Sequence, residues 1–407
     1  MNKEKQHIPA GYKPSPLGPI PEDWEVKRLG EVCTFHDSQR VPIKDADRVK
    51  MKGEYPYYGA SGIIDYVNDY LFDDDLILLG EDGANIINRS TPLAFLVSGK
   101  VWVNNHAHVL KTKDKYNRYF VCLYLESLTY DKYNTGTAQP KLNREICESI
   151  PVLIPKTDEQ NKIATILQLW DTAIEKQTAL IEKLTLRKRG LMQQLLTGKK
   201  RLKGFSGGWK EVRLGKIGTF FKGSGVPKDS ITSEGHKCLT YGDLYTKYDY
   251  VISNVKSYID DNTANNSAKI QYGDICFAGS GETKEDIGKC AAFIDGQCAY
   301  AGGDIIVFRA EGFNPITLSY ILNSDSVIRQ KSNLGQGHSV VHIYPYQLER
   351  ITISSPSIEE QTAIASVLIN ADKEIELANK KLARLQEEKR GLMQVLLTGK
   401  KRIHNLQ

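Results

Sequence analysis

Apolar residues recur every three or four positions along two long stretches of the chain, which is the spacing of one face of an α-helix. In the first stretch they are Ile163, Leu167, Trp170, Ile174, Ile181, Leu184, Leu191 and Leu195. In the second they are Ile364, Leu368, Ala371, Ile375, Ala378, Leu382, Leu385, Leu392 and Leu396. Each stretch predicts one long amphipathic helix. The first, from Thr157 to Thr197, is expected to be roughly 60 Å long at 1.5 Å per residue.

Helix start and stop signals flank both stretches. An S/T-x-x-E/Q capping box follows a proline at each start, and a glycine with basic residues follows each end. These signals are Thr157 with Gln160 and Ser357 with Glu360 at the starts, and Gly198 and Gly399 at the ends. A helix of this length cannot bury its apolar face on a small domain alone. We therefore expect the two helices to pack on each other as an antiparallel coiled coil.

The two helices belong to an internal repeat. At one constant offset Pro155 aligns with Pro356 and Arg201 with Arg402, and the helix ends read "RGLMQQLLTGKKR" and "RGLMQVLLTGKKR". At a smaller offset "WEVKRLGEVCTF" aligns with "WKEVRLGKIGTF". An ordinary helical bundle is the alternative reading, but it requires only apolar residues to repeat. Because polar residues repeat as well, we interpret the ends as a face shown twice to one kind of partner.

Between the repeated segments, short β-type runs alternate with Gly, Pro and Asn. Examples are "DDLILLG" and "VWVNNHAHVLK" in the first half and "GGDIIVFRA" in the second. Each half also has one helix-like stretch, at 116–128 and at 315–322. The predicted fold class is α+β: two globular, mainly-β domains separated by two long antiparallel helices, in a pseudo-twofold repeat. The predicted boundaries are 1–156 (Pro-rich N-terminal arm and first domain), 157–198 (first helix), 199–355 (second domain) and 356–407 (second helix and tail).

Composition narrows the class of protein only a little. The 407 residues are 41% hydrophobic and 25% charged, which excludes wholesale disorder, and a net charge of +5 is too small to argue for a polyanion partner. None of the seven cysteines forms a C-x-x-C pair, so we expect reduced thiols. The sequence has no run of about 18 apolar residues and no apolar signal core. It therefore predicts a cytoplasmic protein without a membrane partner.

No stretch of the sequence carries a recognisable catalytic motif. "GETKEDIGKC" at 281–290 departs from a phosphate loop, because its glycines are seven apart and Cys290 stands where Ser or Thr would bind Mg²⁺. His106-x-His108 places two imidazoles on one strand face, but no third metal ligand has suitable spacing. A polar strand surface is favoured there, and a DNA contact is the alternative. The sequence thus predicts no catalytic residue, no metal and no cofactor.

The repeated motifs resemble those of one known family. "PIPEDWEVKRLGEV", "VLIPKTDEQNKIATIL", "ISSPSIEEQTAIASVL" and the two helix ends are similar to segments of the specificity (S) subunits of type I restriction–modification systems, over nearly the whole of 21–402. The resemblance implies that each domain recognises half of a split double-stranded DNA site and that the helices set the separation of the halves. It also implies that two methyltransferase (M) subunits bind the S subunit, and that restriction or motor (R) subunits join through the resulting methyltransferase complex.

Readout of duplex DNA requires donors and acceptors on loops, with basic groups beside them for the phosphates. In the first domain the candidates are Lys100, Asn105, His106, His108, Gln139, Lys141 and Asn143. In the second domain they are Lys222, Ser280, Lys284, Lys289, His338 and His342. "GTAQPKLN" in the first domain also resembles the end of a target-recognition domain in the family, whereas the second domain reads "GQGHSVVHI" there. For each single residue, a solvated loop is the alternative.

Three functions compete on this sequence. The favoured one is a non-catalytic subunit that gives a type I complex its DNA specificity. The alternatives are a stand-alone DNA methyltransferase or nuclease, and a purely structural adaptor between two proteins. The lack of catalytic motifs in the sequence argues against the first alternative, and specific DNA binding would exclude the second.

Overall fold

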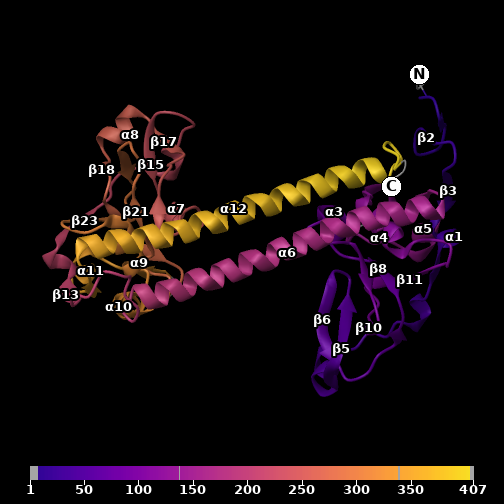
Figure 1. The fold of residues 1–407 in the computed structure, drawn as a ribbon, viewed down its shortest axis with the longest axis horizontal. Helices are drawn as coiled ribbons and strands as arrows, with labels where there is room; N and C mark the ends of the chain where they lie inside the picture. The colour runs from indigo at the N-terminus through magenta and orange to yellow at the C-terminus, as the bar shows by residue number, and fades with distance from the viewer. Residues whose placement is uncertain (1–7, 137, 338–339, 404–407) are drawn as a thin grey trace. The chain divides into compact units, whose positions relative to one another are not determined.

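The computed structural model describes residues 8–136, 138–337 and 340–403. The chain divides into two compact units: unit 1 combines residues 1–178 with 380–407, and unit 2 comprises residues 179–379. Two long helices, α6 (Thr157–Leu195) and α12 (Ile358–Leu396), each begin in one unit and end in the other (Figure 1). Each unit therefore holds one globular body, the start of one long helix and the end of the other.

The sequence predicted both long helices correctly, including the way they end. Helix α6 starts at Thr157 as expected and ends at Leu195. Gly198 and Gly399 take left-handed φ values of 65° and 70°. The amide two residues after each glycine donates to the carbonyl six residues earlier, at 3.2 and 3.0 Å, so each helix is closed by a wide turn through a left-handed glycine.

The predicted capping box is wrong at the first helix start and only half formed at the second, because the side chains of Gln160 and Glu360 bind elsewhere. Thr157 is already inside α6. Gln160 is buried; its amide oxygen accepts the backbone N–H of Asn117 and its amide nitrogen donates to the carbonyl of Pro155. Gln361 makes the same two contacts in unit 2. Each glutamine thus joins the start of a long helix to its body. At the second start the N–H of Glu360 does reach the Ser357 hydroxyl, at 3.5 Å, but the Glu360 carboxylate binds Arg201.

In each unit the start of one long helix packs against the end of the other in antiparallel order. One helix carboxylate joins three elements in each unit: it accepts a tyrosine hydroxyl from the body and pairs with a lysine near the end of the opposite helix. The groups are Tyr119, Asp171 and Lys389 in unit 1 and Tyr320, Asp372 and Lys188 in unit 2. The expected antiparallel pairing is therefore present within each unit.

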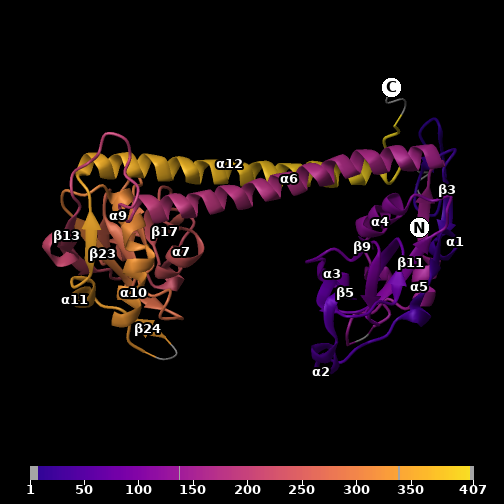
Figure 2. The same cartoon turned by 60° about the horizontal axis from the view of Figure 1, so that its bottom comes forward.

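The body of unit 1 is built on two small four-stranded sheets, in the orders β6-β5-β10-β7 and β4-β11-β8-β9. Helix α4 lies between the strands and α6 (Figure 2). The strands are β1 (Tyr12–Lys13), β2 (Ile20–Pro21), β3 (Glu25–Arg28), β4 (Cys33–Phe35), β5 (Lys52–Gly59), β6 (Gly62–Val67), β7 (Phe72–Asp73), β8 (Leu76–Gly80), β9 (Ala94–Val97), β10 (Lys100–Val103), β11 (Ala107–Thr112) and β12 (Pro151–Ile154). The helices are α1 (Leu29–Val32), α2 (Asp45–Arg48), α3 (Asn85–Asn88), α4 (Arg118–Ser127) and α5 (Arg144–Ser149).

The body of unit 2 has a five-stranded sheet, β14-β23-β19-β21-β16, and a four-stranded sheet, β17-β15-β22-β18. Its strands are β13 (Lys210–Arg213), β14 (Gly218–Lys222), β15 (His236–Leu239), β16 (Val251–Ile252), β17 (Ser257–Ile259), β18 (Ala268–Ile270), β19 (Ile275–Ala278), β20 (Ser280–Gly281), β21 (Cys290–Phe293), β22 (Ala299–Ala301), β23 (Ile305–Ala310), β24 (Val341–His342) and β25 (Thr352–Ser355). Its helices are α7 (Tyr241–Thr246), α8 (Asp261–Asn265), α9 (Pro315–Leu322), α10 (Asp325–Leu334) and α11 (Pro345–Leu348). Both bodies are α+β, as predicted.

Several residues of the repeated helix ending pack or form ion pairs within their own unit. The paired leucines of "LLTGKKR" are buried in the two main cores: Leu396 and Leu397 in unit 1, and Leu195 and Leu196 in unit 2. The terminal arginine of each copy binds the glutamate near the start of the opposite helix, with Arg402 reaching Glu159 at 2.8 Å. Internal packing therefore accounts for the leucines, the glycine and the arginine. Internal packing does not explain why residues of the ending that stay exposed are also repeated.

Candidate nucleic-acid interface

One loop of the first body, which hydrogen bonds hold in place, carries polar candidates for DNA contact. The amide of Thr135 donates to the carbonyl of Lys141 at 2.9 Å, and the side-chain oxygen of Asn134 accepts the amides of Gly136 and Lys141. Gly136 has no room for a side chain, because a Cβ there would lie 1.7 Å from the carbonyl oxygen of Gln139. The side chains of Gln139 and Lys141 are exposed on this loop.

Asn143 directly follows the loop as the N-cap residue of α5. Its side chain is exposed and makes no capping hydrogen bond, so its amide group is free to meet another molecule. The structure thus brings the three candidates of "GTAQPKLN" to one edge of the body.

A turn before β11 adds two more candidates to that edge. Asn105 and His106 are exposed, and the His106 ring lies 2.8 Å from Asp82, which forms a β-bridge with Lys141. Lys141 also lies 3.3 Å from Glu81. The candidate surface of the first body is therefore mixed in charge, with amides and an imidazole beside two carboxylates.

The structure contradicts the role first given to His108. The residue lies in β11, 1% of it is exposed, and both ring nitrogens have partners inside the protein. His106 precedes the strand, so the two imidazoles share no strand face. The alternating pattern failed here because the chain turns at 104–106, and His108 is covered by the segment around Leu142, 34 positions later in the chain.

Lys100 belongs to a different part of the first body. It begins β10, and its ammonium lies 4.7 Å from the ring centre of Tyr70 and 5.8 Å from that of Tyr55. Among the described residues, no hydrogen bond or ion pair connects it with the loop of Gln139. Its exposed charge suits a separate phosphate contact rather than base readout.

In the second body three candidates meet beside the short pair β20–β24. Ser280 and His342 face each other across that pair, and the serine hydroxyl lies 3.0 Å from the His342 ring. Lys222, Ser280 and His342 line one small hollow of about 30 Å³. Ser280 is only 7% exposed, so the exposed groups of this cluster are His342 and Lys222.

The remaining candidates of the second body lie apart from this cluster. Lys284 is exposed on the loop before β21, whereas Lys289 lies 3.6 Å from Asp249 and lines a hollow with Lys331. His338 lies outside the described residues.

Sequence reasoning missed an exposed aromatic pair beside His342. The rings of Tyr344 and Tyr346 stack at 6.0 Å, and the guanidinium of Arg350 lies 5.9 Å from the Tyr346 ring. The run "HIYPYQLER" carried the signal, because two tyrosines flanked by a histidine and an arginine next to a polar loop are typical of a contact surface.

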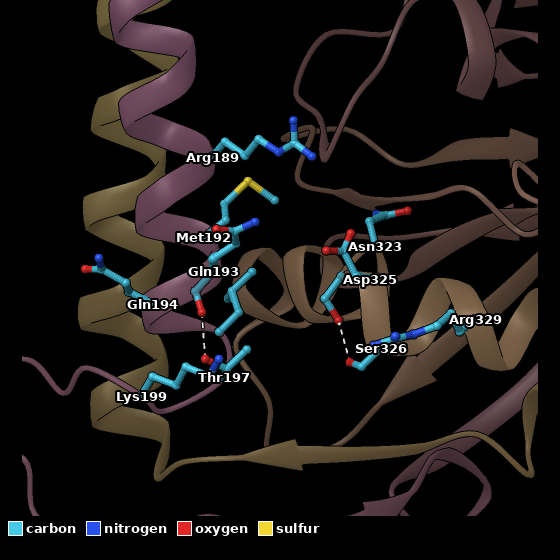
Figure 3. Close-up of a pocket in the computed structure, with 12 residues that line it drawn as sticks. Arg189, Met192, Gln193, Gln194, Thr197, Lys199, Asn323, Asp325, Ser326 and Arg329 are labelled. Carbon is cyan, nitrogen blue, oxygen red and sulfur yellow. Dashed lines mark hydrogen bonds between the residues drawn. The ribbon is translucent and has the colours of Figure 1, made fainter.

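A second surface feature lies where α6 ends in unit 2. A hollow of about 500 Å³ separates the last turns of α6 from the segment joining α9 to α10 (Figure 3). Arg189, Met192 and Gln193 approach it from α6, and Asp325 and Arg329 from the other side. The exposed polar residues of the repeated ending thus border an open space.

At two glycines within the repeated ending, no contact inside the protein prevents a larger side chain. Gly190 and Gly391 lie inside α6 and α12, and a Cβ at either position would meet no atom within 4 Å. A glycine inside a helix costs roughly 1 kcal/mol relative to alanine. The chain has this cost twice, at equivalent positions of the repeat that are open in the structure.

Among the described residues, no three His, Cys, Asp or Glu side chains gather to hold a metal ion. No helix in residues 8–136, 138–337 and 340–403 is long and apolar enough to cross a membrane. All seven cysteines are described and each is a free thiol.

Comparison with known proteins agrees with this architecture. The model of the type I restriction modification DNA specificity domain matches the chain twice, over residues 21–186 and 206–387. A putative type I restriction enzyme specificity subunit from Haemophilus influenzae is 30% identical over 84% of this chain and 86% of its own length. The MjaVIII specificity subunit from Methanocaldococcus jannaschii is 25% identical over 95% of both chains.

A solved structure shares the fold. The S subunit of a type I restriction–modification system from M. genitalium has a TM-score of 0.59 and 15% identity, over 92% of this chain and 96% of its own. The repeat of body and long helix thus matches the repeat of the family domain. This chain belongs to the type I restriction–modification DNA specificity family, whose members are non-catalytic recognition subunits.

Proposed function

We propose that this chain is the DNA-specificity subunit of a type I restriction–modification complex and that each body reads one half of a split site. The observation that carries the proposal is a pair of loops that share one closing backbone hydrogen bond and carry different side chains. The loop of the first body runs from Thr135 to Lys141, and the corresponding loop of the second runs from Gln336 to His342.

Both loops close in the same way. The amide of Gln336 donates to the carbonyl of His342 at 2.9 Å, which matches the Thr135–Lys141 bond in partners and length. The next residue after each loop, Leu142 or Ile343, donates its amide to the segment after a central strand, at 2.7 and 3.0 Å. Two loops with matching closing bonds and different side chains suit two different half-sites.

The side chains of the loops suit two kinds of DNA contact. In the first body, Gln139 and Asn143 can form paired hydrogen bonds with adenine, and Lys141 can donate to guanine or phosphate. In the second, His342 and Lys222 supply the donors of the cluster. Lys100, Lys284 and Lys289 would bind phosphates, which gives affinity without sequence information.

We further propose that two methyltransferase subunits bind the repeated helix endings, one at each, and that restriction subunits join through them. Gly190 and Gly391 support this, because each leaves room for a close backbone contact. The hollow beside Arg189 and Met192 offers the same partner a concave surface. The length of α6 and α12 would set the number of unread base pairs between the half-sites.

Exchange of one body tests the reading of separate half-sites. Residues 31–150 are replaced with the corresponding segment of another family member, which leaves the ladder of β3 and β12 in place. The methylated motif is then mapped by sequencing the genome of a host that supplies the M subunit. We expect one half of the motif to change and the other half to stay.

The matched control exchanges residues 216–350, which lie between β13 and β25 in the second body. It should change the opposite half of the motif. If either exchange alters both halves together, the bodies do not read the site separately.

A further inference from the structure

His108 is the buried ionisable residue that the DNA-contact hypothesis leaves without a role. Its ring lies directly under the loop of the first body, and 1% of the residue is exposed. The Nδ1 atom lies 2.7 Å from the carboxylate of Asp37, and Nε2 lies 2.8 Å from the backbone carbonyl of Leu142. A carboxylate and a carbonyl only accept hydrogen bonds, so both ring nitrogens donate and the ring carries a proton on each.

The groups around the ring fix its direction. Asp37 also accepts the amide of Val109 at 2.9 Å, and Arg40 bonds to Glu81 at 2.6 Å. The Glu81 carbonyl in turn accepts the amide of Leu142. The end of the loop is therefore held at Leu142 by two bonds, one to its amide and one to its carbonyl.

The charge of His108 agrees with this geometry. Burial opposes the charged ring, but the hydrogen bond to Asp37 and the neighbouring Cys147 outweigh that effect and raise the pKa of His108 to about 10. Burial likewise opposes the Asp37 carboxylate, yet the bond from His108 holds the pKa of Asp37 below its ordinary value.

The second body has no histidine and aspartate at the positions that correspond to His108 and Asp37. Leu110 pairs with Phe35 in the first body, and Phe308 pairs with Phe220 in the second, which sets the correspondence of the strands. Counting from these pairs, Ile306 stands where His108 stands, and Lys222 stands where Asp37 stands. An isoleucine side chain donates no hydrogen bond, so the carbonyl after the second loop has no such support.

We propose that His108 is a positioning residue for the first half-site: by holding the carbonyl of Leu142, its ring fixes the loop that carries Gln139 and Lys141. This inference rests on the proposed function of that loop in reading DNA. Without the ring, the Leu142 carbonyl loses its partner and Asp37 is left as a buried carboxylate without its main donor. The loop then shifts, and the geometry that paired base contacts require is lost.

The test compares H108L, H108Q and V97A in the assembled complex with the M subunit. Val97 is buried in β9 of the same sheet, so V97A controls for a loss of core packing alone. The methylated motif is mapped by sequencing the host genome. We expect H108L to reduce discrimination in the first half-site by roughly tenfold at one or more positions and to leave the second half-site unchanged. V97A should leave both halves intact.

Two further measurements keep the proposal testable if H108L fails to fold. Glutamine can replace one of the two ring donors, so H108Q should show a smaller loss at the same half-site. Hydrogen exchange at the amides of Lys141 and Leu142 should accelerate at least tenfold in H108Q and stay unchanged in V97A. This readout does not depend on DNA.

The outcomes separate the positioning role from the proposed function. If both His108 variants keep the first half-site and the protected amides, the positioning role is overturned while the exchange of residues 31–150 still tests the function. If the amides are released but no body exchange changes the motif, the loop is held by His108 but does not read DNA.

Discussion

Single residues show where sequence reasoning reached its limit. The structure places Gln139 and Lys141 exposed on one loop with Asn143 beside them, and their role in DNA contact stays a prediction. Sequence reasoning failed for His108, because a histidine in a strand looks the same in sequence whether it faces solvent or a carboxylate 71 positions away. Exposure depends on which distant strand or loop covers a residue, and periodicity alone carries no information on that pairing.

The buried ring of His108 predicts a specific dependence of stability on pH. The ionisable groups that face it are Asp37 on the turn Asp37–Gln39, Glu81 after β8 and Cys147 on α5. With a pKa raised from its ordinary value to about 10, His108 stabilises the fold fully below about pH 6.5. That contribution falls as the pH rises from there towards 10. The slope from one proton is at most about 1.4 kcal/mol per pH unit.

Thermal unfolding of the native chain and of H108Q, measured between pH 6 and 10, checks this dependence. The difference in melting temperature should be largest at pH 6 and should narrow as the pH rises. Below about pH 4 the contribution of Asp37 begins to fall as well, and it is lost as the pH passes through the lowered pKa of the folded carboxylate. A difference that grows with pH would show that the ring is neutral in the folded protein.

The exposed groups of the loops predict two distinct kinds of binding defect. Q139A and N143A should each weaken discrimination at one base pair by about 1–3 kcal/mol, because a paired hydrogen bond to a base is lost. K284A should instead weaken binding to all sequences and reduce the slope of affinity against salt by about one unit. Competition binding with matched and mismatched duplexes, at several salt concentrations, measures both. Unchanged discrimination in both amide variants would remove them from the readout surface.

At the scale of the element, the sequence predicted the long helices well because their signals are local. A repeated apolar face and a terminal glycine need no tertiary contact to be recognised. The helix starts were predicted less well, because the side chains of Gln160 and Glu360 bind residues 43 and 159 positions away instead of capping their own helix. Local motifs thus fail where a long-range partner offers a buried hydrogen bond.

The two helix-ending glycines predict a graded loss of stability. G198A and G399A both force a left-handed φ on a residue with a Cβ, at a cost of roughly 1–2 kcal/mol. Gly399 also faces Pro21, whose Cδ would lie 2.6 Å from the new Cβ, whereas at Gly198 the nearest atom, in the Trp209 ring, is 3.3 Å away. G399A should therefore cost about 1–3 kcal/mol more than G198A. The helix-interior variant G190A is the control and should raise stability by about 0.5–1 kcal/mol. Thermal unfolding ranks the three, and equal losses at both ends would rule out the contact with Pro21 as a constraint.

At the scale of the whole molecule, the internal repeat was visible in sequence. The sequence did not show which repeated residues pack inside each unit and which stay exposed. The paired leucines and the terminal arginine of the repeated ending turned out to serve the cores and helix pairs within the units. What remains exposed in both copies is a smaller set around Gly190 and Gly391. A surface that occurs twice in a pseudo-twofold chain suits two equivalent partners.

The last prediction concerns the number of those partners. If an M subunit places its backbone against each glycine, a bulky side chain there must displace it. G190L and G391L should each reduce the complex from two M subunits per chain to one, and the double variant should bind none. Both single variants should fold, because each position is open in the structure. Native mass spectrometry of the co-expressed subunits reads the stoichiometry directly. A383L adds the same bulk at an exposed position of α12 outside the repeated ending and should keep two M subunits. If the double glycine variant still binds two M subunits, the docking surface lies elsewhere on the chain. If the native chain binds only one M subunit, the repeated endings are not equivalent.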